Sequence, residues 1–310
     1  MGRTILVIGG LGFVGSHLVD ALVARGDDVR IMDNLEPQVH GTSRNAVLGA
    51  GSTAVLWQGD VRSRRDRLAA MDGAGVVFHL AASVGVGQSM YQVHKYVEVN
   101  TMGTAMLLDI LVNEKHKVET LVVASSMSVY GEGAYTCKEC GLISPSVRSP
   151  EQLQQSEWEI RCPHCKGQLG PQPTTEKKPL MPTSIYAFTK RHQEEMCLAI
   201  GQAYGIRVVS LRYFNIYGPR QALSNPYTGV AAIFSSRLLN GRPPVIFEDG
   251  LQSRDFIHVS DVVQATLLAM DSERANGEVL NVGMGRRTTV LEMARILSTE
   301  LCGLKMGDYQ

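Results

Sequence analysis

The stretch TILVIGGLGFVGSHL, residues 4–18, decides the fold. An apolar run at residues 4–8 leads directly into closely spaced glycines, and an amphipathic segment at residues 13–25 follows. The first pattern predicts a buried strand and the second a helix, with the glycines in the turn between them. Such a turn lets the backbone approach a pyrophosphate, and the helix N-terminus offers free N–H groups to the phosphates. We therefore predict a dinucleotide site at Gly9, Gly12, Phe13, Val14 and Gly15.

A carboxylate at the end of the next apolar run supports the same site. Asp33 closes the run VRIMD and comes 18 residues after Gly15. At that place it can accept hydrogen bonds from an adenosine ribose and would repel a 2′-phosphate, so NAD is favoured over NADP. The alternative is a packing cluster of glycines with a surface aspartate. We also assign Asn34, Asp60 and Val61 to the adenosine end of the cofactor.

Short apolar runs alternate with helical patterns along most of the chain. Buried strands separated by helices imply βαβ units, and hence a parallel sheet covered on both faces. We predict an α/β fold with a Rossmann-like doubly wound parallel sheet and a small C-terminal lobe. The expected strands are residues 4–8, 29–32, 54–57, 76–80, 120–124 and 207–212, and the clearest expected helices are residues 13–25, 104–112 and 186–204.

Residues 131–182, hereafter the cysteine insertion, break this alternation. The segment has no clear period and is too long for an ordinary loop, so we expect it to have its own scaffold. Two CxxC pairs, Cys137/Cys140 and Cys162/Cys165, are separated by 21 residues. That spacing is typical of a zinc ribbon, whose closed shell of four thiolates makes the ion structural rather than catalytic. Redox dithiols and chance pairing are the alternatives. We expect this ribbon beside the active-site mouth, as a rigid lid or a subunit contact.

Composition narrows the class of protein. The 310 residues carry a formal net charge of zero, which argues against a general nucleic-acid or membrane-surface binder, since both depend on basic charge. The basic run at residues 62–67 is interpreted as a solvated helix face. No segment approaches the roughly 20 apolar residues of a membrane span, and no secretory signal precedes the first strand, so we expect a cytoplasmic protein. Cys197 and Cys302 are expected to be small buried apolar residues.

Tyr186 and Lys190 stand four positions apart in a segment with good helical character, and therefore share one helix face. The lysine ammonium and an oxidised nicotinamide would both favour the phenolate, lowering a pKa that is ordinarily about 10. A phenolate there can take a proton from a sugar hydroxyl while a hydride leaves the same carbon. By itself the pair could be a surface pair, and it gains weight from the N-terminal turn.

Six stretches occur in the order of the extended short-chain dehydrogenase/reductases, and the chain resembles their nucleotide-sugar epimerase/dehydratase branch. The match extends over nearly everything except the cysteine insertion. The stretches are GGLGFVGSHL, HLAAS (79–83), SSMSVYG (125–131), YAFTK (186–190), RYFNIYGPR (212–220) and RDFIHVSD (254–261). The resemblance implies that Ser126 hydrogen-bonds the reacting sugar oxygen, that Tyr186 is the catalytic base and acid, and that Lys190 binds the nicotinamide ribose.

The resemblance also implies the remaining contacts. Asn215 and Arg254 would hold the substrate diphosphate, with Arg220 a further candidate. The other implied cofactor contacts are Leu80, Ala81 and Ala82, and the other implied substrate contacts are Ser83, Val84, Ser126 and Ser128. His79 and His258 are interpreted as structural hydrogen-bonding residues.

The implied domains are a NAD-binding domain (residues 1–136 and 166–215), a zinc ribbon (137–165) and a substrate lobe (216–310), part of which returns to the first domain. Related chains continue for several elements beyond the segment 281–285, so a shortened lobe is expected here. The resemblance also suggests a homodimer packed through residues 100–113 and 186–204.

The branch contains both epimerases and 4,6-dehydratases. The dehydratases carry Thr-Asp-Glu before VYG, where this chain has Ser126, Met127 and Ser128. A thioether and a hydroxyl cannot replace two carboxyl groups in proton transfer at neutral pH, so dehydration is disfavoured. The resemblance then implies 4-epimerisation through a transient 4-keto sugar.

Residues 33–41, 81–91 and 225–234, with the cysteine insertion, are most similar to dTDP-L-rhamnose 4-epimerases; UDP-glucose and UDP-glucuronate 4-epimerases are also close. A 4-keto reductase and, in a different class, a non-catalytic NAD-sensing scaffold are the alternatives.

Overall fold

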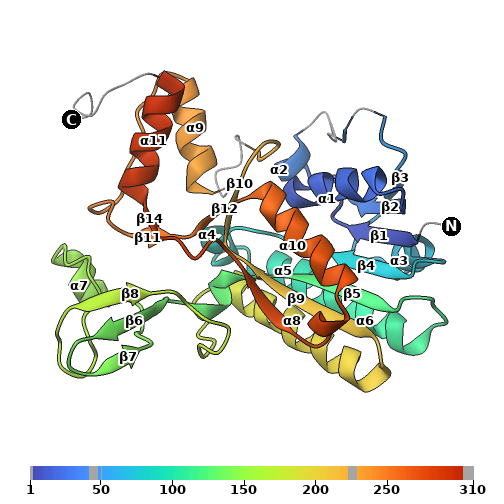
Figure 1. The fold of residues 1–310 in the computed structure, drawn as a ribbon, viewed down its shortest axis with the longest axis horizontal. Coiled ribbons are helices and arrows are strands. Elements are labelled where there is room, and N and C mark those ends of the chain that lie inside the picture. The colour runs from blue at the N-terminus through green and yellow to red at the C-terminus, as the bar shows by residue number, and fades with distance from the viewer. Residues whose placement is uncertain (1–2, 42–47, 50, 223–228, 303–310) are drawn as a thin grey trace.

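The computed structural model describes residues 3–41, 48–49, 51–222 and 229–302 (Figure 1). Its centre is a seven-stranded sheet with the order β13-β9-β5-β4-β1-β2-β3, in which all neighbouring strands are parallel. The chain turns away from β1 in both directions, so a crevice opens beside β1 at the carboxyl ends of the strands. This confirms the Rossmann-like sheet. The strands are β1 (Thr4–Ile8), β2 (Asp28–Asp33), β3 (Val55–Gln58), β4 (Val76–His79), β5 (Thr120–Ser126), β9 (Arg207–Tyr213) and β13 (Val279–Val282).

Helices cover both faces of the sheet (Figure 1). Ile5 and Val7 of β1 pack with α1 (Phe13–Ala24) and α10 (Val259–Asp271) on one face. Leu6 and Ile8 pack on the opposite face, whose core includes residues of the helices α3 (Arg64–Met71), α6 (Gly103–Asn113) and α8 (Ile185–Tyr204). Because successive side chains of a strand point to opposite faces, one apolar run supplies both cores.

Two predicted elements differ from the structure. The side chains of β3 are exposed rather than buried, because β3 is the last strand of the sheet and has a neighbour on one side only. The helix expected at residues 104–112 is the end of a longer one, which runs through α5 (Val93–Tyr96), the π-helical turn η1 (Val97–Met102) and α6. The other predicted strands and helices agree with the structure to within two residues at each end.

The cysteine insertion forms its own small scaffold, as predicted. Strands β6 (Ala134–Cys137), β7 (Gly141–Ile143) and β8 (Leu169–Gln172) make an antiparallel sheet, accompanied by the short helix α7 (Pro150–Gln154). Its core contains two of the cysteines with Ile143 and Leu169. Figure 1 shows this unit to one side of the main sheet.

The last third of the chain contributes to two places. Helices α9 (Val230–Leu239) and α11 (Val290–Cys302) share a separate apolar cluster that contains Phe234, Val290 and Ala294. By contrast, β13 and α10 return to the main sheet. Within the described ranges no helix combines the length and the apolar character that crossing a membrane requires.

Two short strand pairs and four short helices complete the described elements. The pairs are β10 (Asn215–Tyr217) with β12 (Phe256–His258), and β11 (Ser253–Arg254) with β14 (Thr288–Thr289). The short helices are α2 (Pro37–His40), α4 (Val86–Ser89), η2 (Met127–Tyr130) and η3 (Glu273–Ala275). Cys197 is buried as predicted, whereas the side chain of Cys302 and part of the stretch 225–234 lie outside the described residues.

Candidate active site

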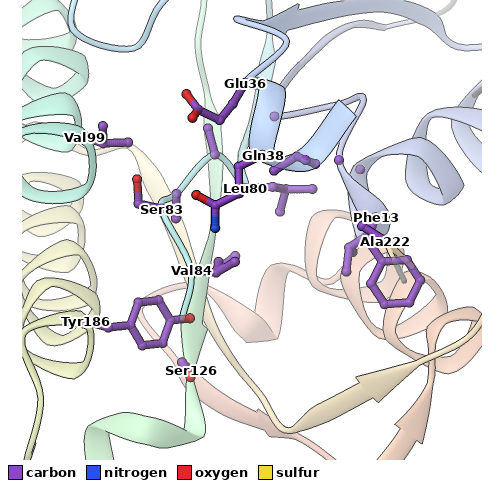
Figure 2. Close-up of a pocket in the computed structure, with 18 of the residues that line it drawn as sticks. Phe13, Glu36, Gln38, Leu80, Ser83, Val84, Val99, Ser126, Tyr186 and Ala222 are labelled. Atoms are coloured by element: carbon purple, nitrogen blue, oxygen red, sulfur yellow. The ribbon is translucent and has the colours of Figure 1, made fainter. Parts of the chain in front are cut away.

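A cavity of about 640 Å³ lies at the carboxyl ends of β1, β2, β4 and β5 (Figure 2). Residues from the glycine-rich turn, from β2 and from α8 meet in its wall, although they are far apart in the sequence. The predicted contacts that line it are Gly9, Gly12, Phe13, Val14, Gly15, Asp33, Asn34, Val61, Leu80, Ala81, Ala82, Ser83, Val84, Ser126, Tyr186, Lys190 and Asn215. The predicted contacts Asp60, Ser128, Arg220 and Arg254 are not among the residues that line it.

The turn between β1 and α1 has space only for glycine. Gly9 has a φ of +81°, and a Cβ there would lie 2.7 Å from the backbone nitrogen of Ala81. A Cβ on Gly15 would lie 2.2 Å from the carbonyl oxygen of Gly9. Helix α1 begins after Gly12 without a side-chain cap, so its first N–H groups remain available at the cavity. This arrangement fits a pyrophosphate.

The Asp33 carboxylate is held in a fixed orientation. Its two oxygens accept hydrogen bonds from the backbone N–H groups of Leu11 (3.1 Å) and Leu35 (2.9 Å). The residue is 9% exposed, yet it lines the cavity. A fixed negative charge at this place can accept hydrogen bonds from ribose hydroxyls and repels a 2′-phosphate, so the site fits NAD.

Tyr186 and Lys190 lie on the face of α8 that lines the cavity, as their spacing predicted. The helix begins with Ser184, whose hydroxyl accepts a hydrogen bond from the N–H of Ala187 (3.2 Å), and this cap places Tyr186 in the first turn. Tyr186 and Ser126 both line the cavity, and Figure 2 shows their side chains together at one end of it. The ammonium of Lys190 donates to the carbonyl of Ala124 at 2.8 Å.

The electrostatics of this pair differ from the prediction. Burial raises the pKa of Tyr186, although the neighbouring Ser126 hydroxyl lowers it in part. Burial also lowers the pKa of Lys190 to about 7. The same low-dielectric surroundings therefore disfavour both the phenolate and the ammonium. The expectation that Lys190 brings the tyrosine pKa towards neutrality is not met by the protein groups alone.

Two further residues hold the catalytic face in place, and sequence analysis did not single them out. Asn100, in the π-helical turn, donates to Thr189 Oγ1 and to the carbonyl of Ser83, both at 3.0 Å, and accepts from the Ser83 N–H at 2.7 Å. The ring of Tyr96 meets that of Tyr186 edge-on, with centroids 6.4 Å apart. Local pattern offers no distinct signal for Asn100, because the nearby Glu98 and Thr101 are polar as well.

Segments on opposite sides of the cavity are joined by polar side chains that line it. Lys95 of α5 forms an ion pair with Glu36 (3.1 Å), and the side-chain amides of Gln38 and Gln88 bond each other at 2.9 and 3.0 Å. These four residues all line the cavity. Their partners lie about 50 or more residues away, so no local pattern predicts the pairs.

The family model described as the NAD dependent epimerase/dehydratase family matches residues 5–150 and 164–283. The chain belongs to this family. A curated dTDP-L-rhamnose 4-epimerase of Burkholderia thailandensis is 33% identical over 298 residues, which cover 96% of this chain and 81% of that protein. The interruption of the match, residues 151–163, falls within the cysteine insertion.

Solved structures of similar proteins agree with the family. The UDP-glucose 4-epimerase of Thermotoga maritima with UDP-glucose superposes with a TM-score of 0.77 at 29% identity, covering 99% of this chain and 85% of that one. The UDP-glucose 4-epimerase of Thermus thermophilus in complex with NAD has a TM-score of 0.72 at 30% identity, covering 96% and 82%. The likeness extends over the whole described fold rather than the NAD-binding half alone.

The arginines assigned to the diphosphate in this epimerase/dehydratase family member have other partners. Arg220 forms an ion pair with Asp20 at 2.7 Å. Arg254 donates to the carbonyl of Ser253 at 2.8 Å and is exposed. Asn215, by contrast, lines the cavity and donates to the carbonyl of Asp255 at 3.2 Å. The roles of the two arginines stay predictions.

Other polar residues that the sequence assigned to a site or to a surface bond to neighbouring residues. The Asp60 carboxylate is hydrogen-bonded by the Arg62 guanidinium, which lowers its pKa to about 2. The hydroxyl of Ser128 donates to that of Ser126 at 3.0 Å. The expectation of a solvated face at residues 62–67 is wrong for Arg67, which is fully buried and donates to the carbonyl of Val61. His79 is structural as predicted, with its ring nitrogen 2.9 Å from the Thr104 hydroxyl.

The four cysteines of the insertion meet at one point. All four Sγ atoms lie within 4.8 Å of one another, and the residues are Cys137, Cys140, Cys162 and Cys165. Each is a free thiol. A tetrahedral zinc with Zn–S distances of about 2.3 Å needs sulfurs about 3.8 Å apart. The donor set and the spacing therefore fit a zinc ion.

Proposed function

We propose that the chain is an NAD-dependent 4-epimerase of a nucleotide-diphosphate sugar, of the dTDP-L-rhamnose or UDP-hexose/UDP-glucuronate type. The observation that carries this proposal is that Ser126 and Tyr186 lie together in the wall of the cavity formed by the glycine-rich turn and Asp33. Relatives named as 4-epimerases of dTDP-L-rhamnose and UDP-glucose support the substrate class.

The proposed reaction needs one group that moves a proton and one that holds the sugar. Tyr186 takes the proton of the sugar 4-hydroxyl, and the Ser126 hydroxyl donates a hydrogen bond to the same oxygen. Bound NAD supplies a hydride acceptor that later returns the hydride to the same carbon. Because the 4-keto carbon is planar, return to its other face inverts the configuration, and Tyr186 gives the proton back. Lys190 would hold the nicotinamide ribose, and the positive charge of the oxidised ring would favour the phenolate of Tyr186.

The neighbours of Ser126 support epimerisation over dehydration. Met127 and Ser128 follow it in η2, and the Ser128 hydroxyl is bonded to Ser126. Neither side chain can serve as the acid or base that removal of water requires. The proposed reaction therefore eliminates no water from the sugar.

Incubating the protein with candidate nucleotide sugars and following the 4-epimer by NMR tests the proposal. The Tyr186→Phe variant should lose turnover by about 10²- to 10⁴-fold while its NAD content stays unchanged. Tyr204→Phe is the matched control, because this tyrosine ends the same helix and is 54% exposed. A non-catalytic NAD-binding scaffold would convert none of the sugars. Undiminished turnover in Tyr186→Phe would overturn the mechanism.

We propose further that the four cysteines hold a structural zinc, since their thiolates fill all four positions of a tetrahedral shell. Metal analysis should give one zinc per chain, and Cys140→Ser should lower it. A protein that loses its zinc with no change in stability or activity would contradict the structural role.

The remaining proposals concern assembly and organisation. We propose a homodimer packed through α6 with η1 and through α8, because these helices expose Met102 (58%) and Phe188 (44%). Sedimentation velocity tests it. We also propose the domain limits given above, with the shared cluster of α9 and α11 as the core of the substrate lobe, and a cytoplasmic location.

A further inference from the structure

An ion pair joins the cysteine insertion to the C-terminal part of the chain. Arg148 Nη1 lies 2.7 Å from Glu248 Oε2, across 100 residues of sequence. The two side chains are only 22% and 20% exposed, and the Glu248 carboxylate raises the pKa of Arg148. The same nitrogen, Nη1, also donates to the carbonyl of Trp158 at 3.1 Å, so one end of the guanidinium makes two bonds. A half-buried, doubly bonded arginine of this kind is more than a loose surface pair.

Glu248 lies eight residues before Phe256, the one residue of the segment 248–256 that lines the cavity. It is followed by β11, by Asp255 and by Phe256, which lines the cavity. Asp255 accepts hydrogen bonds from the N–H groups of Met284 and Gly285, at 2.9 and 2.7 Å, and its carbonyl accepts from Asn215. Because Glu248 has a φ of +59°, the backbone at this point already adopts an uncommon conformation that a fixed side chain helps to hold.

The other end of the connection is fixed to the main sheet. Asn281 of the edge strand β13 donates from its backbone N–H to Glu176 and from its amide to the carbonyl of Thr174, both at 2.9 Å. Its side-chain oxygen accepts from Tyr130 at 2.7 Å, and Tyr130 accepts from Arg212 at 2.7 Å. These bonds attach the stem of the insertion to the sheet, so the insertion spans from β13 to the loop around Glu248.

We propose that Arg148 is a positioning residue, through which the cysteine insertion holds the segment 248–256, and with it Phe256 in the cavity wall, in the place that the nucleotide sugar requires. The inference rests on the proposed function, because it assigns this part of the wall to substrate binding. The insertion is thus a strut between the sheet and the substrate side of the cavity. NAD, which binds at the glycine-rich turn on the opposite side, does not depend on it.

Charge reversal tests the strut. Arg148→Glu and Glu248→Arg should each raise the KM for the nucleotide sugar about tenfold, while kcat changes by less than about twofold. Titration calorimetry with UDP and with dTDP should show the same loss of nucleotide affinity without turnover. The double variant restores an ion pair in reverse and should recover most of the KM. A purely structural role for Arg148 would lower the stability of the fold without raising KM at nearly unchanged kcat.

Arg242→Glu is the matched control, because it makes the same charge change near Glu248, and the described structure gives Arg242 no ion pair and an exposed side chain. NAD and zinc content should equal those of the wild type in every variant. Arg148→Gln, which removes only the charge, replaces Arg148→Glu if charge reversal lowers the yield of folded protein.

The outcomes separate the two proposals. If the wild type converts a nucleotide sugar and both single variants keep its KM and its nucleotide affinity, the proposed role of Arg148 is wrong and the epimerase proposal stands. If each single variant is impaired and the double variant is no better, the charge pair is not the positioning contact. If the wild type converts no nucleotide sugar, the proposed function is wrong, and the role of Arg148 in substrate binding is wrong with it.

Discussion

At the scale of single residues, the ionisation of Tyr186 and Lys190 is the central physical question. Burial raises the pKa of Tyr186 and lowers that of Lys190 to about 7, so both groups favour their neutral forms. The positive charge that stabilises the Tyr186 phenolate would then come from the oxidised nicotinamide and not from Lys190. Coupling the ionisation of Tyr186 to cofactor binding would keep the base inactive until NAD is present.

The shifted pKa of Lys190 predicts a pH dependence of stability for the NAD-free protein. The folded protein releases the Lys190 proton near pH 7, whereas the unfolded chain keeps it to about pH 10.4. Between these values the unfolded state binds more protons, so the free energy of unfolding rises with pH. The wild type should therefore gain stability relative to Lys190→Met between about pH 7 and about pH 9. Urea unfolding of both proteins at several pH values measures this difference. If the free energy of unfolding depends on pH in the same way for both proteins, the pKa of Lys190 is not lowered in the folded state.

At the scale of elements, the turn between β1 and α1 combines two separate demands on one glycine. Gly9 needs a positive φ, and it also has no room for a Cβ beside Ala81. Gly26, after α1, has the same φ of +81°, but a Cβ there would meet nothing within 4 Å. Comparing substitutions at Gly9 and Gly26 therefore separates the cost of the positive φ from the cost of the collision with Ala81.

Gly26→Ala should cost about 1 kcal/mol of unfolding free energy, because only the left-handed backbone is penalised. Gly9→Ala should cost about 2 kcal/mol or more, because the collision with Ala81 is added, and it should also weaken NAD binding. Denaturant unfolding and NAD titration measure the two effects. Equal costs at both positions would mean that the turn relaxes around the methyl group.

The bridges that cross the cavity predict retention of the cofactor. Lys95–Glu36 and Gln38–Gln88 join the segment after β2 to helices α4 and α5 over the site where NAD is proposed to bind. The double variant Lys95→Ala/Gln38→Ala should release NAD about two- to fivefold faster, because the surface ion pair and the part-buried amide pair each contribute about 0.5 kcal/mol. NAD remaining after gel filtration measures it. Lys115→Ala, an exposed lysine outside the cavity lining, should behave as wild type.

At the scale of the whole molecule, one buried ion pair connects the catalytic helix, the sheet and the insertion. Arg212 of β9 donates to Glu194 of α8 at 3.0 Å, and both side chains are at most 5% exposed. The same guanidinium stacks on Tyr130, whose hydroxyl reaches β13. The Arg212 guanidinium therefore makes contacts that link three parts of the fold.

Removing one partner of this pair leaves the other buried and unpaired. Glu194→Ala should lower the free energy of unfolding by about 3–5 kcal/mol, far more than the exposed-pair variant Glu195→Ala on the same helix. Chemical denaturation followed by circular dichroism compares them. A loss for Glu194→Ala as small as that for Glu195→Ala would mean that water reaches Arg212.

Much of this protein follows from local sequence pattern. Apolar period, glycine spacing and the i, i+4 relation of Tyr186 and Lys190 depend on neighbours within one or two turns of chain, so they predicted the parallel sheet, the dinucleotide turn and the catalytic face. The CxxC pairs predicted the cysteine cluster for the same reason, because thiolate spacing within each knuckle is local.

Only the tertiary structure decided what depends on distant partners. Four features are of this kind: the burial of Arg67, the exposure of β3, the position of Asn100 and the pairing of Arg148 with Glu248. Each depends on contacts between segments that lie tens to 100 residues apart, or on the place of a strand in the sheet. The ionisation of Tyr186 and Lys190 belongs to this class as well. Burial is a property of the assembled surroundings, and the desolvation that shifts both pKa values has no counterpart in the order of the residues along the chain.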